Sequence, residues 1–183
     1  MKIRILGPAY PYRGGIAKFN EVLAASFGRE GHDVKIVSFT LQYPAFLFPG
    51  RTQYTRMAAP EGVAIERRIN SVNPLNWPAV GREIARERPD LLIPRFWMPF
   101  MGPSLGTIAR TVRRHLPRTR VVALADNIVP HEHRPGDRPL TGYFLRQTDA
   151  VVYMSDEVGR DLDSFGYRGL KAMTPHPIYD VYG

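Results

Sequence analysis

The sequence predicts an α/β domain with a doubly wound, mainly parallel sheet and helices on both faces, in three αβα layers. Short apolar runs of strand length alternate along the chain with longer segments whose apolar residues recur at helical spacing. Strands that alternate with helices form parallel sheets, whose strands are apolar throughout because both faces are buried. The 183 residues, 44% of them hydrophobic, suffice for one domain with its own core.

The N-terminal part predicts a strand, a helix and a second strand. Residues 2–6 form an apolar strand that leads into a turn containing two prolines. Residues 15–29 place large apolar side chains on one face at helical spacing, and Gly31 ends this helix. Residues 34–39 are a second apolar strand, so the chain opens with a strand–helix–strand unit.

An irregular segment, a third strand and a second helix come next. Residues 41–62 are rich in proline, glycine and aromatic residues, which predicts a long irregular segment. Residues 63–69 alternate between apolar and polar side chains, as a strand does. We expect Asn73 to cap a short helix that ends at Arg88, where Pro89 stops it.

The rest of the chain continues the alternation, which brings the expected number of strands to six or seven. The third helix turns its apolar residues inward and Arg110, Arg113 and Arg114 outward. The expected elements are, in order, a strand at 91–93, a helix at 101–117, a strand at 120–125, a short helix at 140–147, a strand at 150–154, a helix capped by Ser155 and Asp156 that ends near 165–166, and a strand at 170–173.

Charge and composition narrow the class of protein. The net charge is +8, and nearly all of the positive charge is arginine, which suits bidentate contacts with phosphate. Nucleic acid, an anionic membrane surface, phosphorylated substrates and a merely solvated surface all fit this excess. The sequence has no cysteine, which excludes disulfide and thiolate chemistry and predicts a cytoplasmic protein. We expect neither a membrane span nor a signal peptide, since no apolar run is long enough.

A glycine pair lies between the first strand and the first helix. Gly14 and Gly15 come directly before the helix that continues with Ile16. Glycine lets a ligand approach the backbone closely, and the free N–H groups of a helix start favour an anion. The pair therefore predicts a site for a phosphate or a hydroxyl-rich ligand, with a flexible turn as the alternative. The loop has neither the G-x-G-x-x-G pattern of dinucleotide sites nor a G-x-x-x-x-G-K-[ST] phosphate loop.

A second polar cluster follows the strand at 120–125. The stretch DNIVPHEH places Asp126, Asn127, His131, Glu132 and His133 just past a buried strand, at the sheet edge where ligands bind. Asp126 and His131 are candidates for binding sugar hydroxyls or for acting as a base. Solvated loop histidines and a turn-capping aspartate are the alternatives. We expect no metal site, because adjacent residues point apart and no spaced ligand set accompanies them.

Four stretches together resemble one enzyme family. They are RGGIAKFNEVLAASFGREGHDVKIVSF, ALADNIVPHE, TDAVVYMSDEVGRDL and PHPIYDVYG, in that order and with sensible spacings. The ordered set resembles the N-terminal domain of a retaining glycosyltransferase of the GT-B architecture, family 4. The resemblance spans nearly the whole chain and implies a Rossmann-like domain.

On the donor side, the resemblance implies that Gly14 and Gly15 lie at a cleft, near the phosphates of a nucleotide-sugar donor. Arg13 and Lys18 are the candidates for stabilising the leaving phosphate with positive charge, with plain surface positions as the alternative. The nucleotide diphosphate sugar is a substrate, and the resemblance implies neither a cofactor nor a metal.

On the acceptor side, the resemblance implies that Asp126, Asn127 and His131 orient the acceptor. Asp126 stands where the family often has a histidine, so a role of that histidine does not carry over, but an aspartate still accepts hydrogen bonds from hydroxyls. Glu132 follows His131 as in the family's later pair, and Ser155 matches a serine at a strand end. The leaving phosphate is commonly supposed to take the acceptor proton, so a protein base is not required.

The resemblance also bears on domain organisation. Enzymes of this architecture have a second Rossmann-like domain that holds most of the donor, and residues 1–183 contain nothing that corresponds to it. We therefore expect 1–183 to be the acceptor-side domain of a longer enzyme, inactive by itself. A naturally short protein is the alternative.

The expected partners are a nucleotide sugar, an acceptor glycan or glycolipid, and the missing C-terminal domain. Peripheral membrane contact fits a cytoplasmic enzyme of this kind. The segment Leu41–Met57, with aromatic residues and arginines, is a candidate acceptor loop, unless its rings simply pack on the domain. The main rival is a stand-alone nucleotide-binding or nucleic-acid-binding module, although the sequence carries no nucleic-acid motif.

Overall fold

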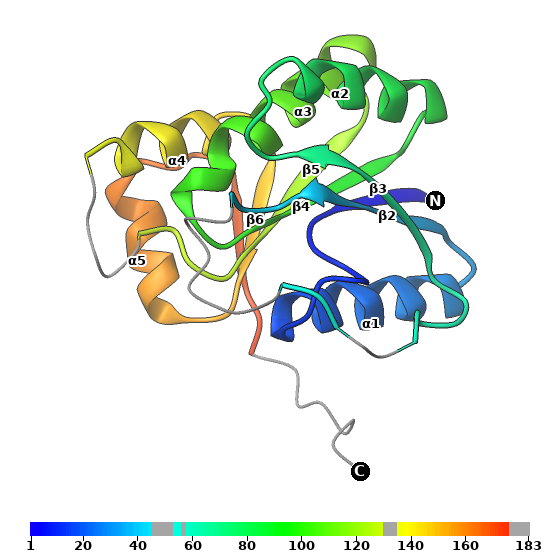
Figure 1. Cartoon of the computed structure of the whole chain (residues 1–183). Helices are drawn as coiled ribbons and strands as arrows, with labels where there is room; N and C mark the ends of the chain where they lie inside the picture. Colours follow the sequence, from blue (N-terminus) through cyan, green and yellow to red (C-terminus); the bar gives the residue numbers. More distant parts are fainter. Residues whose placement is uncertain (45–52, 56–57, 130–134, 176–183) are drawn as a thin grey trace.

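The computed structural model describes residues 1–44, 53–55, 58–129 and 135–175, and its elements alternate between strand and helix along the chain (Figure 1). In chain order they are β1 (Lys2–Leu6), α1 (Gly15–Arg29), β2 (Asp33–Leu41), β3 (Ala64–Asn70), α2 (Asn76–Glu87), β4 (Leu91–Phe96), the 3₁₀ turn η2 (Pro99–Met101), α3 (Gly102–His115), β5 (Arg120–Ala125), α4 (Asp137–Leu145), β6 (Ala150–Tyr153), α5 (Asp156–Ser164) and β7 (Leu170–Met173).

The strands form one parallel sheet of seven in the order β3-β2-β1-β4-β5-β6-β7. Helix α1 covers one face, and α2 and α3 cover the other (Figure 1). The predicted doubly wound, three-layer α/β fold is therefore confirmed. The chain winds outward from β1 in both directions, which places the topological switch point between β1 and β4. Ligands of such sheets bind outside the carboxyl ends of the strands at that point.

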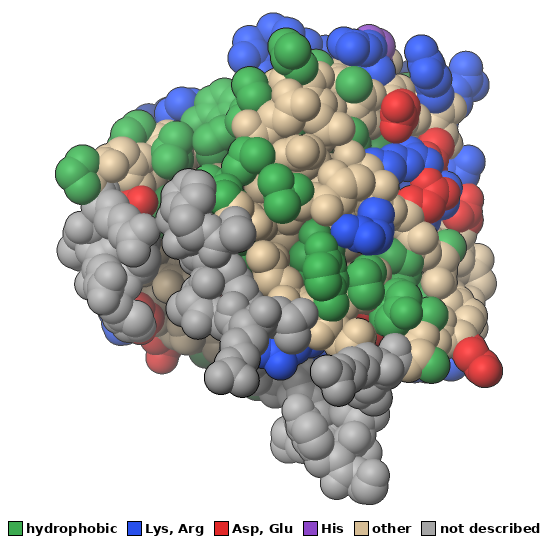
Figure 2. Space-filling model, in the orientation of Figure 1, with side chains coloured by type: hydrophobic (Ala, Val, Ile, Leu, Met, Phe, Trp, Pro, Cys, Tyr) green, Lys and Arg blue, Asp and Glu red, His purple; other side chains and the backbone are tan. Residues whose placement is uncertain are grey.

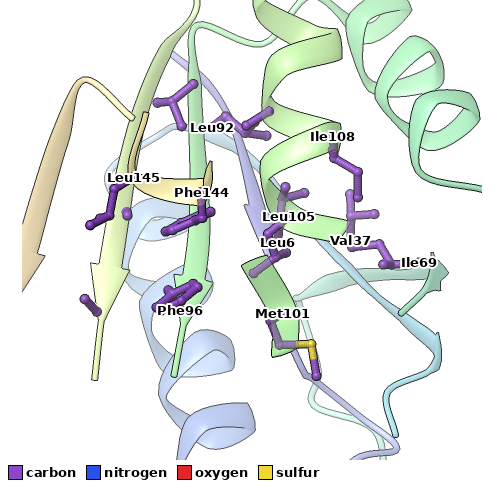
Figure 3. Close-up of a cluster of buried hydrophobic side chains, with 14 of the residues drawn as sticks. Leu6, Val37, Ile69, Leu92, Phe96, Met101, Leu105, Ile108, Phe144 and Leu145 are labelled. Atoms are coloured by element: carbon purple, nitrogen blue, oxygen red, sulfur yellow. The ribbon is translucent and has the colours of Figure 1, made fainter. Parts of the chain in front are cut away.

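The larger hydrophobic core lies between the sheet and the helices α2, α3 and α4 (Figure 3). Leu6 and Val37 of the sheet meet Leu105 and Ile108 of α3, and all four side chains are buried. Phe96 at the end of β4 stacks on Phe144 of α4, with ring centroids 4.4 Å apart and planes at 10°. This packing fixes the carboxyl end of β4, which matters for the site described below.

Element boundaries differ from the sequence expectation in informative places. Strand β4 extends to Phe96, three residues beyond the predicted end at Ile93, because Pro94 and Arg95 continue the strand beside β1 and β5. The expected helix cap at Asn73 is wrong. Its Oδ1 accepts the N–H of Leu75 at 3.0 Å, which forms a turn ahead of α2 rather than a cap on it.

The outward arginines of α3 are confirmed in part. Arg110 and Arg114 are exposed, and Figure 2 shows lysine and arginine side chains gathered along the top of the molecule, over α2 and α3. Arg113 instead reaches the carboxylate of Asp149 at 3.2 Å and the carbonyl of Gln147 at 3.1 Å. It therefore ties α3 to the start of β6.

A charged cluster joins β1, β2 and β3 to the end of α2. The carboxylate of Glu87 accepts Arg4 Nε at 2.6 Å and Arg68 Nη1 at 2.9 Å, and Lys35 Nζ lies 3.4 Å away. Burial alone would raise the pKa of Glu87, but the hydrogen bonds from Arg4 and Arg68 outweigh it and lower that pKa below its ordinary value of 4.5. The carboxylate form therefore stabilises the fold.

Replacing Glu87 by glutamine will make the protein less stable at pH 7 by about 2 kcal/mol, because charged donors lose an anionic partner. A lowered carboxyl pKa gives stability that is present above the unfolded value of 4.5 and lost as pH falls through the folded value. The difference between wild type and Glu87→Gln should therefore shrink below pH 4.5 in urea unfolding curves. Glu61→Gln, at an exposed glutamate, serves as the control. A difference that stays constant from pH 7 to 3 would contradict the assignment.

Candidate functional site

The loop between β1 and α1 is held in place by the elements beneath it. The N–H of Ala9 donates to Ser38 Oγ of β2 at 3.2 Å, and Asn20 of α1 donates its side-chain amide to the carbonyl of Pro8 at 2.8 Å. Glu21, also on α1, accepts the N–H of Tyr10 at 2.8 Å. These bonds give residues 8–10 of the loop a defined path.

The same loop is held from its other side by residues 53–55. The N–H of Arg13 donates to the carbonyl of Gln53 at 3.0 Å, and the N–H of Thr55 donates to that of Pro11 at 2.7 Å. Part of the predicted irregular segment is thus folded against the glycine loop. Residues 45–52 and 56–57, which include the rest of the candidate acceptor loop, lie outside the described residues.

The glycine pair forms the entry to α1. Gly14 is the N-cap residue, with φ 119° and ψ 167°, a conformation that is essentially restricted to glycine. A Cβ at Gly14 or Gly15 would meet no atom within 4 Å, so the approach is open. The first turn of α1 has neither an acidic residue nor a side-chain cap. Its first N–H groups are therefore available to an anion, which the helix dipole also favours.

The predicted cationic residues flank this entry. Arg13 and Lys18 are both exposed, and Arg13 and Gly14 line a cavity of about 230 Å³ together with Tyr12, Gln42 and Tyr43. This cavity follows the carboxyl ends of β1 and β2. The structure therefore brings Arg13 and Gly14 to one small site, with Gly15 and Lys18 on the first turn of the adjoining helix.

Asp126 follows β5 and is held by a buried arginine that the sequence analysis did not identify. Arg95 of β4, 2% exposed at its side chain, donates Nε to Asp126 Oδ2 at 2.6 Å and Nη2 to Oδ1. The arginine also lies over the ring of Phe19 in α1, at 4.0 Å from its centroid. Asp126 is thus an anion fixed in place, with lone pairs left for a hydroxyl group.

Arg95 connects the two predicted halves of the site. Its side chain spans from Phe19, one turn into α1, to Asp126 beyond β5, beneath the switch point between β1 and β4. Its Nη1 is buried without a hydrogen-bond partner among the described residues. A charge within the apolar run LLIPRF is the signal that would have identified it.

The remaining predicted residues are placed to different extents. Asn127 is half-buried beside Asp126, and Ser155 follows β6, the strand next to β5. Ser155 Oγ accepts the N–H of Val158 at 3.4 Å, so the predicted helix cap is confirmed. His131 and Glu132, like the neighbouring His133, lie outside the described residues.

Aromatic side chains wall the site on the β2 and β4 side. Trp97 Nε1 donates to the hydroxyl of Tyr43 at 2.5 Å. The ring of Tyr43 stacks on the ring of Phe100, with 6.4 Å between the ring centroids. Burial raises the pKa of the Tyr43 hydroxyl, so it stays protonated. Tyr43 therefore packs on the domain, which is the alternative considered for the rings of Leu41–Met57. Tyr54 of the same segment keeps 44% of its surface exposed.

Within residues 1–44, 53–55, 58–129 and 135–175, no group of three or more histidine, aspartate or glutamate side chains is arranged to hold a metal ion. None of the helices in these ranges is long and apolar enough to cross a membrane.

The family model of the glycosyl transferase 4-like domain matches residues 14–174 of the chain. No curated protein matches the chain. The matched range begins at Gly14, the N-cap of α1, and contains every helix of the described residues and the strands β2 to β7. It includes the glycine pair and Asp126, whereas β1 and Arg13 precede it.

Solved structures with the same fold include three sugar-processing proteins. Sucrose-phosphate synthase from Thermosynechococcus elongatus superposes with a TM-score of 0.60 at 12% identity, covering 96% of this chain and 48% of that one. The catalytic domain of starch synthase IV from Arabidopsis thaliana, bound to ADP and acarbose, superposes with a TM-score of 0.56 at 12% sequence identity. The match covers 94% of this chain and 51% of that one. An alpha-glucosyltransferase in complex with UDP and a 13-mer DNA superposes with a TM-score of 0.54 at 14% sequence identity, and the match covers 93% of this chain and 40% of that one. The chain thus spans about half or less of each.

Proposed function

Because the chain belongs to the glycosyl transferase 4-like domain family, we propose that it is the acceptor-side domain of a retaining glycosyltransferase of the GT-B architecture. In this proposal the whole enzyme moves a sugar from a nucleotide diphosphate to an acceptor hydroxyl. A second domain supplies most of the donor site, which agrees with the half-length coverage of the structural neighbours. Residues 1–183 alone are inactive, since they hold one side of the cleft.

The observation that carries this proposal is the open N-terminus of α1 at the switch point of the sheet. Gly14 and Gly15 leave its N–H groups accessible, and no carboxylate occupies the first turn. A departing nucleoside diphosphate gains negative charge as the bond to the sugar breaks. Prearranged N–H groups stabilise that charge without reorganisation, and Arg13 and Lys18 add positive charge at the same end.

The acceptor binds on the Asp126 side. Arg95 holds both carboxylate oxygens, so Asp126 orients a hydroxyl by accepting its hydrogen bond rather than removing its proton. Asn127 follows in the chain and adds an amide to the same edge, while roles for His131, Glu132 and Ser155 in binding remain predictions. The leaving phosphate takes the acceptor proton, and closure of the second domain over this edge excludes water.

No cofactor is part of the proposal, because a nucleotide sugar is consumed as a substrate. The structural neighbours are described with UDP or ADP, which supports a nucleoside diphosphate as the leaving group. The rival of a stand-alone binding module loses weight, since the family match spans residues 14–174.

The protein encoded by the complete gene should release a nucleoside diphosphate from one nucleotide sugar in a panel, and faster when acceptor is added. Coupled detection of UDP, ADP and GDP measures this release. The isolated 183-residue chain, assayed in parallel, should release none. A complete protein that leaves every nucleotide sugar in the panel intact, with mixed glycans and lipid extracts as acceptors, would contradict the proposal.

A further inference from the structure

A second cavity lies between α4 and the turn from α5 to β7. Its volume is about 530 Å³, within the range of small-molecule sites. It borders the amino ends of β6 and β7, because Thr148 precedes β6 and Gly169 precedes β7. Gly14 and Asp126 follow the carboxyl ends of β1 and β5, so this cavity is at the opposite edge of the sheet from the proposed transfer site.

The charge of this cavity is of one sign. Of the residues that the structure describes, Arg138, Arg146 and Arg168 line it, and no aspartate or glutamate does. Among the described residues, Arg146 and Arg168 have no side-chain hydrogen bond or ion pair. All three arginines are exposed, so their guanidinium groups are accessible to a ligand, and guanidinium matches the geometry of phosphate.

Arg138 is fixed by its surroundings. Its guanidinium lies over the ring of Phe165, at 4.6 Å from the centroid, and donates to the carbonyl of Ser164. The contact orders both the arginine and the ring at the cavity wall. Tyr167 supplies a second ring, which a bond of 2.9 Å between its hydroxyl and Thr148 Oγ1 holds in place. One wall of the cavity is therefore aromatic and ordered.

Gly142 keeps the cavity open. It lies between Arg138 and Arg146 on one face of α4, at positions i, i+4 and i+8. A Cβ there would sit 3.6 Å from Arg146 Nη1 and 3.9 Å from the Phe165 ring, in ordinary contact and without a clash. A larger side chain at this position would extend into the cavity, which supplies a way to fill it without changing its charge.

We propose that this cavity binds a small phosphorylated molecule that carries a flat ring. The phosphate lies between Arg146 and Arg168, and the ring packs against Phe165 and Tyr167. The site is separate from the transfer edge and does not rest on the proposed function. The cavity recognises a phosphate with an attached ring, and such a ligand is an effector or a second substrate of the whole protein.

Phenyl phosphate and inorganic phosphate are the probes, titrated into the ¹⁵N-labelled 183-residue chain. Phenyl phosphate should shift the amides of residues 165–169 and bind about tenfold more tightly than inorganic phosphate, since a buried ring adds apolar contact. The double variant Arg146→Gln/Arg168→Gln should weaken phenyl phosphate binding at least about tenfold. Arg110→Gln/Arg114→Gln, with the same change of charge on α3, should leave binding unchanged.

Gly142→Leu gives an independent result, because it fills the cavity and retains all three arginines. It should abolish the shifts at 165–169, with thermal unfolding confirming that each variant is folded. If the two double variants weaken phenyl phosphate binding equally, binding depends on net charge alone, which would overturn the proposed site. Shifts confined to other residues, or equal affinity for the two probes, would overturn it as well.

Discussion

Replacing Arg95 by methionine will lower the free energy of unfolding by about 3–5 kcal/mol, the largest stability effect that we expect from a single polar residue in this fold. Its guanidinium is buried, donates to both oxygens of Asp126 and lies on the ring of Phe19. Methionine fills much of the volume but leaves the Asp126 carboxylate without a counter-charge in a half-buried position. Urea unfolding of both proteins at pH 7 measures the difference.

Two further variants separate loss of the pair from loss of packing. Arg95→Met combined with Asp126→Leu should recover most of the stability, because removing both charges from a buried pair is close to neutral. Arg113→Met is the matched control, since Arg113 pairs with Asp149 at 3.2 Å while 37% of its side chain is exposed. It should cost at most about 1 kcal/mol. If Arg95→Met costs no more than Arg113→Met, the buried pair does not have the importance that we assign to it.

Gly15→Ala will lower the transfer rate of the complete enzyme about 10²-fold while leaving its stability unchanged. The added methyl meets no protein atom within 4 Å, and the backbone there is helical, so the fold tolerates it. The methyl would instead occupy the space in which a diphosphate approaches the first N–H groups of α1. Loss of one such donor typically costs two to three orders of magnitude in rate.

Gly14→Ala tests the neighbouring residue, for which the expectation differs. With φ at 119° and ψ at 167°, alanine is strained there, so this variant should also lose about 1–3 kcal/mol of stability. Gly28→Ala, near the other end of α1 and equally open to solvent, is the control and should keep full activity. Wild-type transfer by a folded Gly15→Ala enzyme would exclude the α1 N-terminus from the reaction.

Much of the fold could be predicted from the sequence, because the information is local. The strand at 120–125 and the helix at 15–29 have the predicted bounds, since apolar runs and helical spacing directly encode what a sheet and a covering helix bury. The last strand, 170–173, was also predicted correctly. The polar residues after β1 and β5 reach the same sheet edge because the strands are parallel.

What could not be predicted depends on contacts between distant segments. In the local sequence Arg95 is simply a residue at the end of an apolar strand. Its charge can be buried because the carboxylate of Asp126, 31 residues later in the chain, pairs with it. The β1–α1 loop has a defined path because Ser38, Asn20 and Gln53 bond to it, and none of these is marked by local pattern. The Asn73 cap failed because the side chain closed a local turn instead, a choice that the residue type leaves open.

The most direct test of the proposed site is a titration of the ¹⁵N-labelled chain with inorganic diphosphate, which carries the charge of the leaving group without specifying a base. The largest amide shifts at the carboxyl edge should fall on residues 14–18, and Gly15→Ala should reduce them. Shifts at 165–169 would report the second cavity and leave this result unaffected. If the amides of residues 14–18 do not move at concentrations that saturate other sites, the glycine-ended loop does not bind the donor phosphates.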